Sequence, residues 1–326
     1  MDFGVVGTAN IARGAVIPAI RKTDHRVLAV GSRDPDRARE FADSLDVPRA
    51  YGSYAELLDD GDLDAVYNPL PNALHAEWTK RAADRGLDVL CEKPLSVDAA
   101  EAGELGQYAD DAGVTLMEAF MYRYHPRTER AVEVAREHLG DLRFVHASFQ
   151  FPLPRGRDDV RLDPDLAGGS LMDVGSYAVS TARLFLGEPV RVRATSHDGW
   201  SAGVDTEFSA VMEFEDGATA TVTSGFDSVD AQHYRVDGSE GWLTADPAYV
   251  PRDDGSVTMT WAADGRTVQE TFDPVDQYRL EVGHFAEAVE SGDSPRTDAA
   301  EAARNMAVID ALKQSAATGE PVDVDG

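Results

Sequence analysis

A lysine at the end of an apolar run is well placed to do chemistry. Residues 88 to 94 read Asp-Val-Leu-Cys-Glu-Lys-Pro, which predicts a buried strand ending in Glu92 and Lys93. Pro94 restricts Lys93 to extended backbone angles, so its ammonium is held in one direction. Lysine can give up its proton when desolvated, whereas arginine cannot. We therefore predict a proton-handling role for Lys93, with a solvated strand-end charge as the alternative.

Lysine is otherwise scarce, which adds weight to this position. The chain has 30 Lys and Arg together, but its lysines are only Lys22, Lys80, Lys93 and Lys313. Arginine supplies nearly every other cation, so a lysine kept at a strand end indicates chemistry that arginine cannot perform.

A second reactive pair follows two glycines. Residues 168 to 177 read Gly-Gly-Ser-Leu-Met-Asp-Val-Gly-Ser-Tyr and precede an amphipathic run, so we expect a helix there and close approach of a ligand at the glycines. Asp173 and Tyr177 are four residues apart and would share a helix face. A tyrosine hydroxyl can transfer a proton, and a nearby ammonium lowers its pKa. Two structural alternatives stay open: Ser170 and Asp173 could form a capping box, and Tyr177 could belong to the core.

The loop after the first apolar run indicates a dinucleotide site. Residues 7 to 12, Gly-Thr-Ala-Asn-Ile-Ala, follow a strand expected at 3–6 and open a helix. Gly7 can make the tight turn, but alanines 9 and 12 replace the second and third glycines of the fingerprint. An ordinary strand-to-helix turn is the alternative. The nucleotide-binding residues predicted here are Gly7, Thr8, Ala9, Asn10 and Ile11.

The end of the second expected strand indicates which nucleotide binds. NAD sites commonly place an acidic residue there for the ribose 2′-hydroxyl, but this strand ends in Ser32 and Arg33. A hydroxyl and a guanidinium suit a 2′-phosphate, and Arg37 lies one turn further on. Asp34, followed by proline, is better interpreted as a helix N-cap. NADP is therefore favoured over NAD, and ion-paired surface arginines are the alternative.

Two kinds of sheet must position these residues. Up to about residue 120, apolar runs alternate with helical patterns, with strands expected at 3–6, 27–31, 65–68, 89–92 and 115–117. That alternation is typical of βαβ units in a doubly wound parallel sheet. Later runs with period-two alternation predict an open, mainly antiparallel sheet, at 143–149, 207–214, 219–223 and 256–261. The fold class is thus α/β with a second α+β domain.

The change of pattern predicts two domains. Residues 1–121 would form the nucleotide-binding domain, and residues 122–326 the domain for substrate binding and oligomerisation. A last helix at about 299–316 would close the chain and return to the first domain.

Composition limits the partners. The formal net charge is −29, from 59 acidic and 30 basic residues, which opposes binding to nucleic acids or anionic membranes. Strong acidity with little lysine predicts adaptation to a high-salt cytoplasm, where screening relieves self-repulsion. The single cysteine, Cys91, rules out an internal disulfide, and no apolar run suits a signal peptide or membrane span. We expect a cytoplasmic protein.

The eight histidines show no metal-site pattern. None forms a pair at metal-ligand spacing with a supporting carboxylate, so no catalytic metal is predicted. His75 would either contact the nicotinamide or be structural. His125, which precedes a proline, would be a packed boundary residue or a sugar ligand.

Taken together, these segments resemble one known family. From end to end the chain is similar to the Gfo/Idh/MocA oxidoreductases, through residues 7–12, 32–33, 67–75, 92–94, 117–126 and 173–177. The resemblance implies a Rossmann domain and a domain with an open antiparallel sheet, whose face commonly forms subunit interfaces. It therefore also implies a homo-oligomer.

The resemblance also implies roles for residues. Lys93 would be the catalytic lysine and Tyr177 the acid/base, with Asp173 orienting the sugar or Lys93. Tyrosine at position 177 resembles the branch of aldose dehydrogenases, glucose-fructose oxidoreductases and dihydrodiol dehydrogenases. Phe120 and Arg123 would lie beside the substrate pocket. The cofactor contacts implied are Gly7, Thr8, Ala9, Asn10, Ile11, Ser32, Arg33, Arg37, Pro71, Asn72, His75, Glu92 and Lys93.

The expected function is NADP-dependent oxidation of the C1 hydroxyl of an aldose such as D-xylose, giving a lactone. Tyr177 would remove the hydroxyl proton while Lys93 stabilises the developing oxyanion. The alternatives are an NADPH-dependent reductase of a dicarbonyl sugar such as 1,5-anhydrofructose, or a dihydrodiol dehydrogenase. An alternative of another class is a non-catalytic protein that senses NADP or a sugar.

Overall fold

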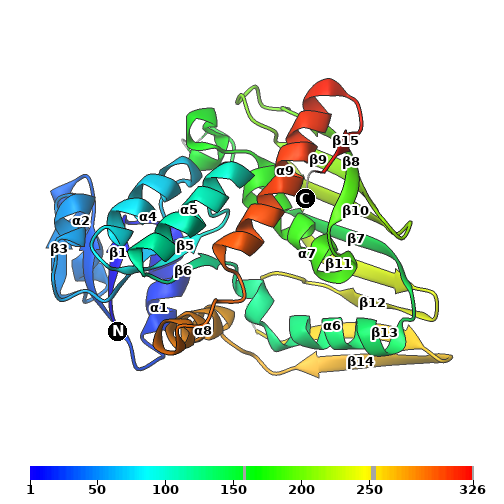
Figure 1. Cartoon of the computed structure of the whole chain (residues 1–326), viewed down its shortest axis with the longest axis horizontal. Helices are drawn as coiled ribbons and strands as arrows, with labels where there is room; N and C mark the ends of the chain where they lie inside the picture. The colour runs from blue at the N-terminus through cyan, green and yellow to red at the C-terminus, as the bar shows by residue number, and fades with distance from the viewer. Residues whose placement is uncertain (157–158, 251–254, 325–326) are drawn as a thin grey trace. The chain divides into compact units, whose positions relative to one another are not determined.

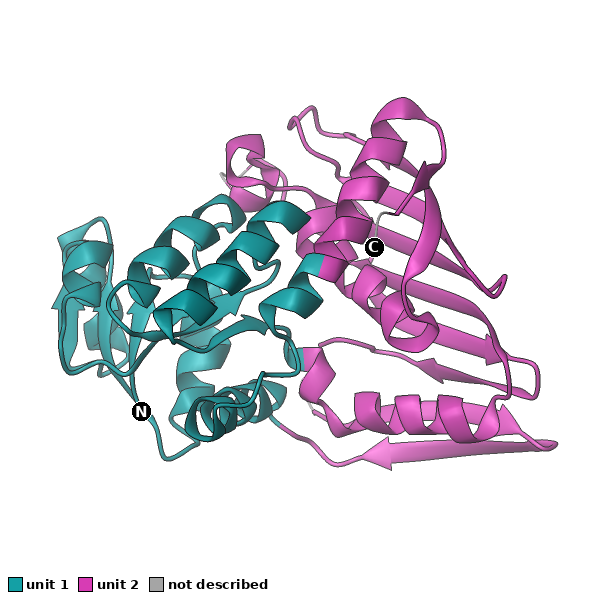
Figure 2. Ribbon diagram, in the orientation of Figure 1, with its two compact units in different colours: residues 1–121, 276–303 teal, residues 122–275, 304–326 magenta. Residues whose placement is uncertain are grey.

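The computed structural model describes residues 1–156, 159–250 and 255–324. Contacts within the chain divide it into two compact units, which Figure 2 shows in different colours. Unit 1 holds residues 1–121 and 276–303, and unit 2 holds residues 122–275 and 304–326.

Unit 1 is built on a six-stranded parallel sheet with strand order β3-β2-β1-β4-β5-β6. The order reverses between β1 and β4, as in doubly wound nucleotide-binding sheets. Five of these strands confirm sequence predictions, whereas β3 has only three residues and no apolar run. The strands are β1 (Asp2–Val6), β2 (Arg26–Gly31), β3 (Arg49–Tyr51), β4 (Ala65–Asn68), β5 (Asp88–Glu92) and β6 (Leu116–Ala119).

Helices connect these strands and bury the sheet. Val5, Val30 and Leu90 are fully buried, as expected for the continuous apolar runs of a parallel sheet. The helices of unit 1 are η1 (Ala12–Val16), α1 (Ile17–Ile20), α2 (Pro35–Ser44), α3 (Tyr54–Leu58), η2 (Asn72–Leu74), α4 (His75–Ala83), α5 (Ala99–Ala112) and α8 (Gln277–Ser291).

Unit 2 contains a nine-stranded sheet with strand order β14-β13-β12-β11-β7-β10-β9-β8-β15. Only the β7–β10 pair is parallel among the described strands of this sheet, which confirms the mainly antiparallel prediction. The strands are β7 (Leu142–Gln150), β8 (Pro189–His197), β9 (Glu207–Phe214), β10 (Thr219–Gly225), β11 (Ala231–Gly238), β12 (Gly241–Ala245), β13 (Val257–Ala263), β14 (Arg266–Phe272) and β15 (Val322–Asp323).

Helices cover one face of the unit 2 sheet (Figure 1). Helix α7 packs on β7 and β10, and α6 packs on β12 and β13. The other face carries the exposed side chains of Phe144 and Val211. The remaining helical elements are η3 (Met121–Tyr124), α6 (Pro126–His138), η4 (Val160–Leu162), η5 (Pro164–Leu166), η6 (Leu171–Gly175), α7 (Ser176–Leu186) and α9 (Ala299–Thr318). No helix in the described part of the chain is long and apolar enough to cross a bilayer.

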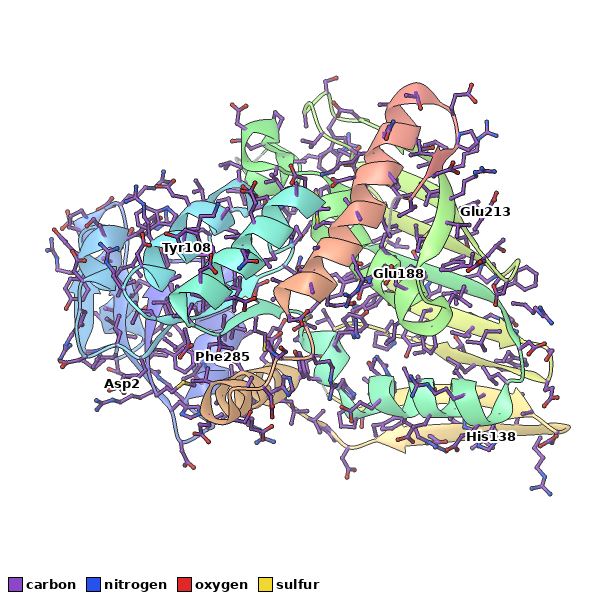
Figure 3. The ribbon with its side chains drawn as sticks, in the orientation of Figure 1. Asp2, Tyr108, His138, Glu188, Glu213 and Phe285 are labelled. Carbon is purple, nitrogen blue, oxygen red and sulfur yellow. The ribbon has the colours of Figure 1, made fainter. Side chains whose placement is uncertain are left out.

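Helix α8 belongs to unit 1, which differs from the continuous second domain of residues 122–326 that the sequence suggests. Phe285 on α8, labelled in Figure 3, is fully buried, and its ring centroid lies 6.0 Å from that of Phe3 in β1. Lys22 also pairs with Asp276 at 2.6 Å. The division between the units falls within α9, after Ala303. An apolar helix face shows that a helix is buried, but not which sheet buries it.

We expect Phe285→Ala to destabilise unit 1, because it leaves a cavity between α8 and β1. The expected cost is about 3–5 kcal/mol, read from denaturant unfolding followed by circular dichroism. Glu287→Ala, an exposed site on the same helix, should change stability by less than about 0.5 kcal/mol. Equal unfolding midpoints for the two variants would contradict the packing of α8 on β1.

Candidate active site

The turn after β1 lies where the strand order of the unit 1 sheet reverses. Gly7 has a φ of +108°, a conformation that favours glycine, and its N–H donates to the Gly31 carbonyl at 2.9 Å. A Cβ atom at Gly7 would lie 3.0 Å from Leu70 Cδ2. Ala12 is fully buried, so the core accommodates the methyl group that replaces the third glycine of the fingerprint.

The helix after this turn can receive an anion. Within the described residues, no side chain caps the start of η1. The Arg13 N–H already donates to the Ala9 carbonyl at 3.2 Å, so the first helical turn is formed there. Backbone N–H groups at the start of a helix lack intrahelical partners and favour negative charge. The residues from Thr8 to Ile11 therefore fit a pyrophosphate group.

The end of β2 agrees with the sequence interpretation. Asp34 is an N-cap, because its Oδ1 accepts two backbone N–H groups of α2, at 2.9 and 3.2 Å. Ser32 is buried, and its Oγ accepts the Asp34 N–H at 3.3 Å. Arg33 and Arg37 are exposed, and neither guanidinium is ion-paired with another described residue. The alternative of ion-paired surface arginines is therefore not observed.

The segment after β4 carries three more predicted cofactor residues. Pro71 and Asn72 are half-buried at the start of η2. His75 is fully buried, with Nδ1 at 2.8 Å from the Pro94 carbonyl and Nε2 at 2.6 Å from the Leu70 carbonyl. Burial lowers the pKa of His75 to about 4. The ring fits the structural alternative, since it ties this segment to the residue that follows Lys93.

Lys93 follows a strand end that several side chains hold. The Tyr67 hydroxyl donates to Glu92 Oε1 at 2.6 Å, and the Lys93 N–H donates to Glu92 Oε2 at 3.3 Å. Two residues on, the Leu95 N–H donates to Glu118 Oε1 at 2.8 Å. Lys93 itself is half-buried. Bonds from β4 and β6 therefore fix the backbone from which the lysine side chain projects.

In unit 2, the capping box that the sequence left open as an alternative does not form at the start of the helix that carries Tyr177. Ser170 Oγ donates instead to Asp205 Oδ2 at 2.7 Å, and the same oxygen accepts the Leu171 N–H at 2.8 Å. Asp205 thus caps η6 from outside the segment, and burial raises the pKa of its carboxyl group. The Asp173 carboxylate is left for another partner.

Gly168 and Gly169 allow other segments of the same chain to approach closely. A Cβ at Gly168 would lie 2.4 Å from the Arg161 carbonyl oxygen, and one at Gly169 would lie 2.4 Å from Asp205 Oδ1. Gly169 also has a φ of +114°. The close approach at these glycines is therefore made by the chain's own loop, which corrects the expectation of a ligand there.

Tyr177 sits in an aromatic cage formed by Tyr122, Phe149 and Tyr249. The three ring centroids lie 5.7, 5.3 and 5.2 Å from that of Tyr177. The hydroxyls of Tyr122 and Tyr249 bond to hydroxyls of α7 at 2.7 and 3.1 Å, so the cage is held to the helix that carries Tyr177. Tyr177 is 5% exposed, in agreement with the core alternative. The same packing fixes the direction of its ring, as proton transfer requires.

Asp173 pairs with Arg161, a residue that the sequence gave no reason to select. Arg161 Nε donates to Asp173 Oδ2 at 2.8 Å, and its Nη1 donates to Asp159 Oδ1 at 3.2 Å. Asp173 is the main cause that raises the pKa of Arg161. The guanidinium lies 5.9 Å from the ring centroid of Phe151. Arg161 lies in a short 3-10 helix and belongs to no sequence motif. The sequence around it therefore does not indicate a functional role.

The other predicted site residues have separate surroundings. Phe120 follows β6 in unit 1 and is 2% exposed. Arg123, in unit 2, donates from Nη1 to Ser180 Oγ at 3.4 Å. His125 Nδ1 accepts the Arg127 N–H at 3.0 Å at the start of α6, and burial lowers the pKa of His125 to about 4. His125 is therefore the packed boundary residue of the two alternatives. No group of three or more His, Cys, Asp or Glu side chains among the described residues could hold a metal ion.

Comparison with known proteins gives matches along most of the chain. The model of an oxidoreductase family with an NAD-binding Rossmann fold matches residues 1–120. The model of the GFO/IDH/MocA C-terminal domain matches residues 132–244. The D-xylose 1-dehydrogenase (NADP(+)) 2 of Haloferax volcanii is 55% identical over 325 residues, which cover 100% of both chains.

Solved structures agree with these matches. A 3-ketoreductase from Actinomadura kijaniata, in complex with NADP and TDP-benzene, has a TM-score of 0.91 at 33% identity, and the match covers 97% of each chain. An aldose-aldose oxidoreductase from Caulobacter crescentus, complexed with glycerol, has a TM-score of 0.91 at 28% identity, with 99% of each chain covered. The chain belongs to the GFO/IDH/MocA oxidoreductase family.

Proposed function

We propose that this chain is an NADP-dependent sugar oxidoreductase that oxidises the C1 hydroxyl of an aldose, such as D-xylose, to a lactone. The observation that carries the proposal is the full-length likeness, at 55% identity, to the D-xylose 1-dehydrogenase of Haloferax volcanii. Lys93 and Tyr177, the two residues that the chemistry requires, are both present.

The proposed reaction divides the work between these two residues. Tyr177 takes the proton of the C1 hydroxyl, the hydride leaves C1, and the oxygen forms a double bond to C1 to give the lactone. Bound NADP⁺ supplies the hydride acceptor. The Lys93 ammonium stabilises the negative charge that develops on the oxygen and favours the phenolate form of Tyr177. Within unit 2 the aromatic cage orders Tyr177, and within unit 1 the bonds at Glu92 order the strand end before Lys93.

Three side chains in the segment that follows β2 support NADP as the cofactor. Asp34 uses its carboxylate to cap α2, so it is not placed as the acid that binds a ribose 2′-hydroxyl. Arg33 and Arg37 are exposed and can pair with a 2′-phosphate. The pyrophosphate would be bound by the turn from Gly7 to Ile11, and Pro71 and Asn72 would contact the nicotinamide end.

We place the sugar beside Asp173. The carboxylate of Asp173 and the guanidinium of Arg161 form a pair that can accept hydrogen bonds from sugar hydroxyls and donate to them. Arg123 adds a second guanidinium near α7, and Phe120 contributes apolar packing in this proposal. The sugar is uncharged, so these bonds orient it and leave the hydride step to Lys93 and Tyr177.

A second candidate is the same chemistry in reverse, the reduction of a ketone on a sugar. The likeness to the Actinomadura kijaniata 3-ketoreductase, at a TM-score of 0.91 and 33% identity, favours it. Tyr177 would then donate its proton to the carbonyl oxygen as the hydride arrives. A non-catalytic sensor is the third candidate, and it predicts cofactor binding without turnover of any sugar.

We also propose that two or more copies assemble through the open face of the unit 2 sheet. Phe144 is 50% exposed and Val211 is 44% exposed on this face. Between them, His146 Nδ1 and Thr221 Oγ1 lie 2.7 Å apart, so these two polar side chains of the face already bond to each other. A second copy would bury these apolar side chains.

Lys93→Ala and Tyr177→Phe should each lower kcat/KM for D-xylose at least about 100-fold, because each removes a group used in proton transfer or charge stabilisation. Turnover is read from the absorbance of reduced nicotinamide in molar KCl. NADPH affinity, measured by fluorescence titration, should change little in Tyr177→Phe. Lys80→Ala and Tyr108→Phe are the matched controls, on half-buried residues of unit 1 outside the proposed site (Figure 3 labels Tyr108). Turnover by either active-site variant within tenfold of the wild type contradicts the mechanism.

Arg33→Ala should raise the KM for NADP about 10- to 100-fold, the value of one charge-assisted hydrogen bond. The KM for NAD should stay nearly constant, because NAD has no 2′-phosphate. Arg39→Ala is the control, since Arg39 lies on α2, the helix that follows Arg33, but pairs with Asp36. An equal loss for NAD and NADP would sink the assignment of Arg33 to the 2′-phosphate.

Val211→Lys should reduce the molar mass measured by light scattering, because it places a charge on the open sheet face. Val229→Lys, at a side chain 79% exposed between β10 and β11, should leave the mass unchanged. A wild-type protein that is monomeric at micromolar concentration would disprove assembly through this face.

A further inference from the structure

A buried carboxyl group on α8 lies among the side chains that hold the strand end before the proposed catalytic lysine. Glu281 is 1% exposed, and its Oε1 has no hydrogen-bond partner within the described residues. It interacts electrostatically with Glu92 at the end of β5 and with Glu118 on β6. Tyr67 and Tyr278 belong to the same buried group. Glu281 has no role in the mechanism proposed above.

Hydrogen-bond donors are unevenly shared among these carboxyl groups. Glu92 accepts the Tyr67 hydroxyl at 2.6 Å and the Lys93 N–H at 3.3 Å. Glu118 accepts the Leu95 N–H at 2.8 Å. Donors of this kind stabilise the ionised form of a carboxyl group, and like charges in a buried space oppose one another. The group with an unbonded buried oxygen is therefore the one that keeps a proton.

The electrostatic surroundings agree with this assignment. Burial is the main cause that raises the pKa of Glu281, and Glu92 and Glu118 raise it further. Burial, together with Glu92 and Glu281, raises the pKa of Tyr67 and of Tyr278, so neither phenol adds a negative charge to this group. Every one of these groups comes from an element of unit 1: β4, β5, β6 or α8.

We propose that Glu281 remains a neutral carboxylic acid in the working enzyme and thereby preserves the positive field of Lys93. Glu281 is a positioning residue, and its effect on catalysis rests on the function proposed above. If it ionised, a further negative charge beside Glu92 would offset the ammonium. The developing oxyanion and the Tyr177 phenolate would then be less stabilised, so turnover would fall.

Glu281→Gln tests the proton directly, because an amide keeps the shape but cannot ionise. In the unfolded chain Glu281 loses its proton near its ordinary pKa of 4.5, whereas the folded protein keeps it to higher pH. The wild type therefore loses stability as the pH rises through this interval, and Glu281→Gln does not. We expect the Tm difference to be small at pH 5 and to reach at least about 2 °C in favour of the variant at pH 8.

Matched variants show whether the pH-dependent change in Tm comes from the buried carboxyl group of Glu281. Glu287→Gln changes an exposed glutamate of the same helix and should show no pH-dependent gain. Glu281→Leu also removes the titrating group, so it should show the same trend as Glu281→Gln and replaces it if the amide variant does not fold. Molar KCl in every sample screens the surface charges but not the buried ones.

The pH profile of kcat/KM tests the effect on Lys93. On this proposal activity ends at high pH where Glu281 ionises, so the alkaline limb marks that ionisation. Glu281→Gln should therefore move the alkaline limb upward by at least about one pH unit and leave the acid limb in place. If Glu281 had only a structural role, its replacement would not move the alkaline limb of kcat/KM.

The outcomes separate the two claims. A Tm difference that does not grow with pH overturns the claim that Glu281 keeps its proton in the folded protein. A pH-dependent Tm difference with an unmoved alkaline limb overturns the positioning role. If the wild type turns over no sugar, the proposed function fails, while the melting data still decide whether Glu281 holds a proton.

Discussion

A charged lysine side chain at the end of a buried strand needs a backbone that cannot shift and surroundings that do not cancel its charge. The parallel register of unit 1 provides the fixed backbone, and the proposed proton on Glu281 limits the opposing charge. Tyr67 pairs with Leu90, and Cys91 pairs with Glu118, so side chains of three strands gather at one edge of the sheet. The bond from Tyr67 to Glu92 at 2.6 Å then holds the strand end itself. The proposed chemistry depends on this edge more than on any single motif.

In unit 2, packing and long-range hydrogen bonds hold Tyr177 in a similar way. Its ring is packed by the aromatic cage, and the start of its helix is capped by Asp205 from a distant loop. Further along α7, Arg183 bonds to Glu188, labelled in Figure 3, at 2.6 Å and to Asn305 of α9 at 3.3 Å. Asn305 in turn donates to the Ser176 carbonyl at 3.4 Å, directly before Tyr177. Long-range bonds thus set the position of a residue whose chemistry is local.

The sequence predicts those features that neighbouring residues decide. The apolar runs of the parallel sheet and the N-cap at Asp34 are local, and both were found. The capping box at Ser170, an alternative that the sequence left open, does not form, because Asp205, far along the chain, accepts the hydrogen bond of the Ser170 hydroxyl. Arg161 and Tyr249 could not be predicted, since they lie in irregular segments and reach their partners only through the fold. For the same reason, the apolar face of α8 did not reveal that this helix belongs to unit 1.

The most direct test of the central claim is the fate of the hydrogen on C1. D-xylose that carries deuterium at C1 would be incubated with the wild-type protein and NADP⁺ in molar KCl, and the reduced cofactor analysed by mass spectrometry. Oxidation of the C1 hydroxyl predicts that the deuterium is found in the cofactor and that a lactone forms. Reduced cofactor without deuterium, or no reduction of NADP⁺ by D-xylose, would contradict the account.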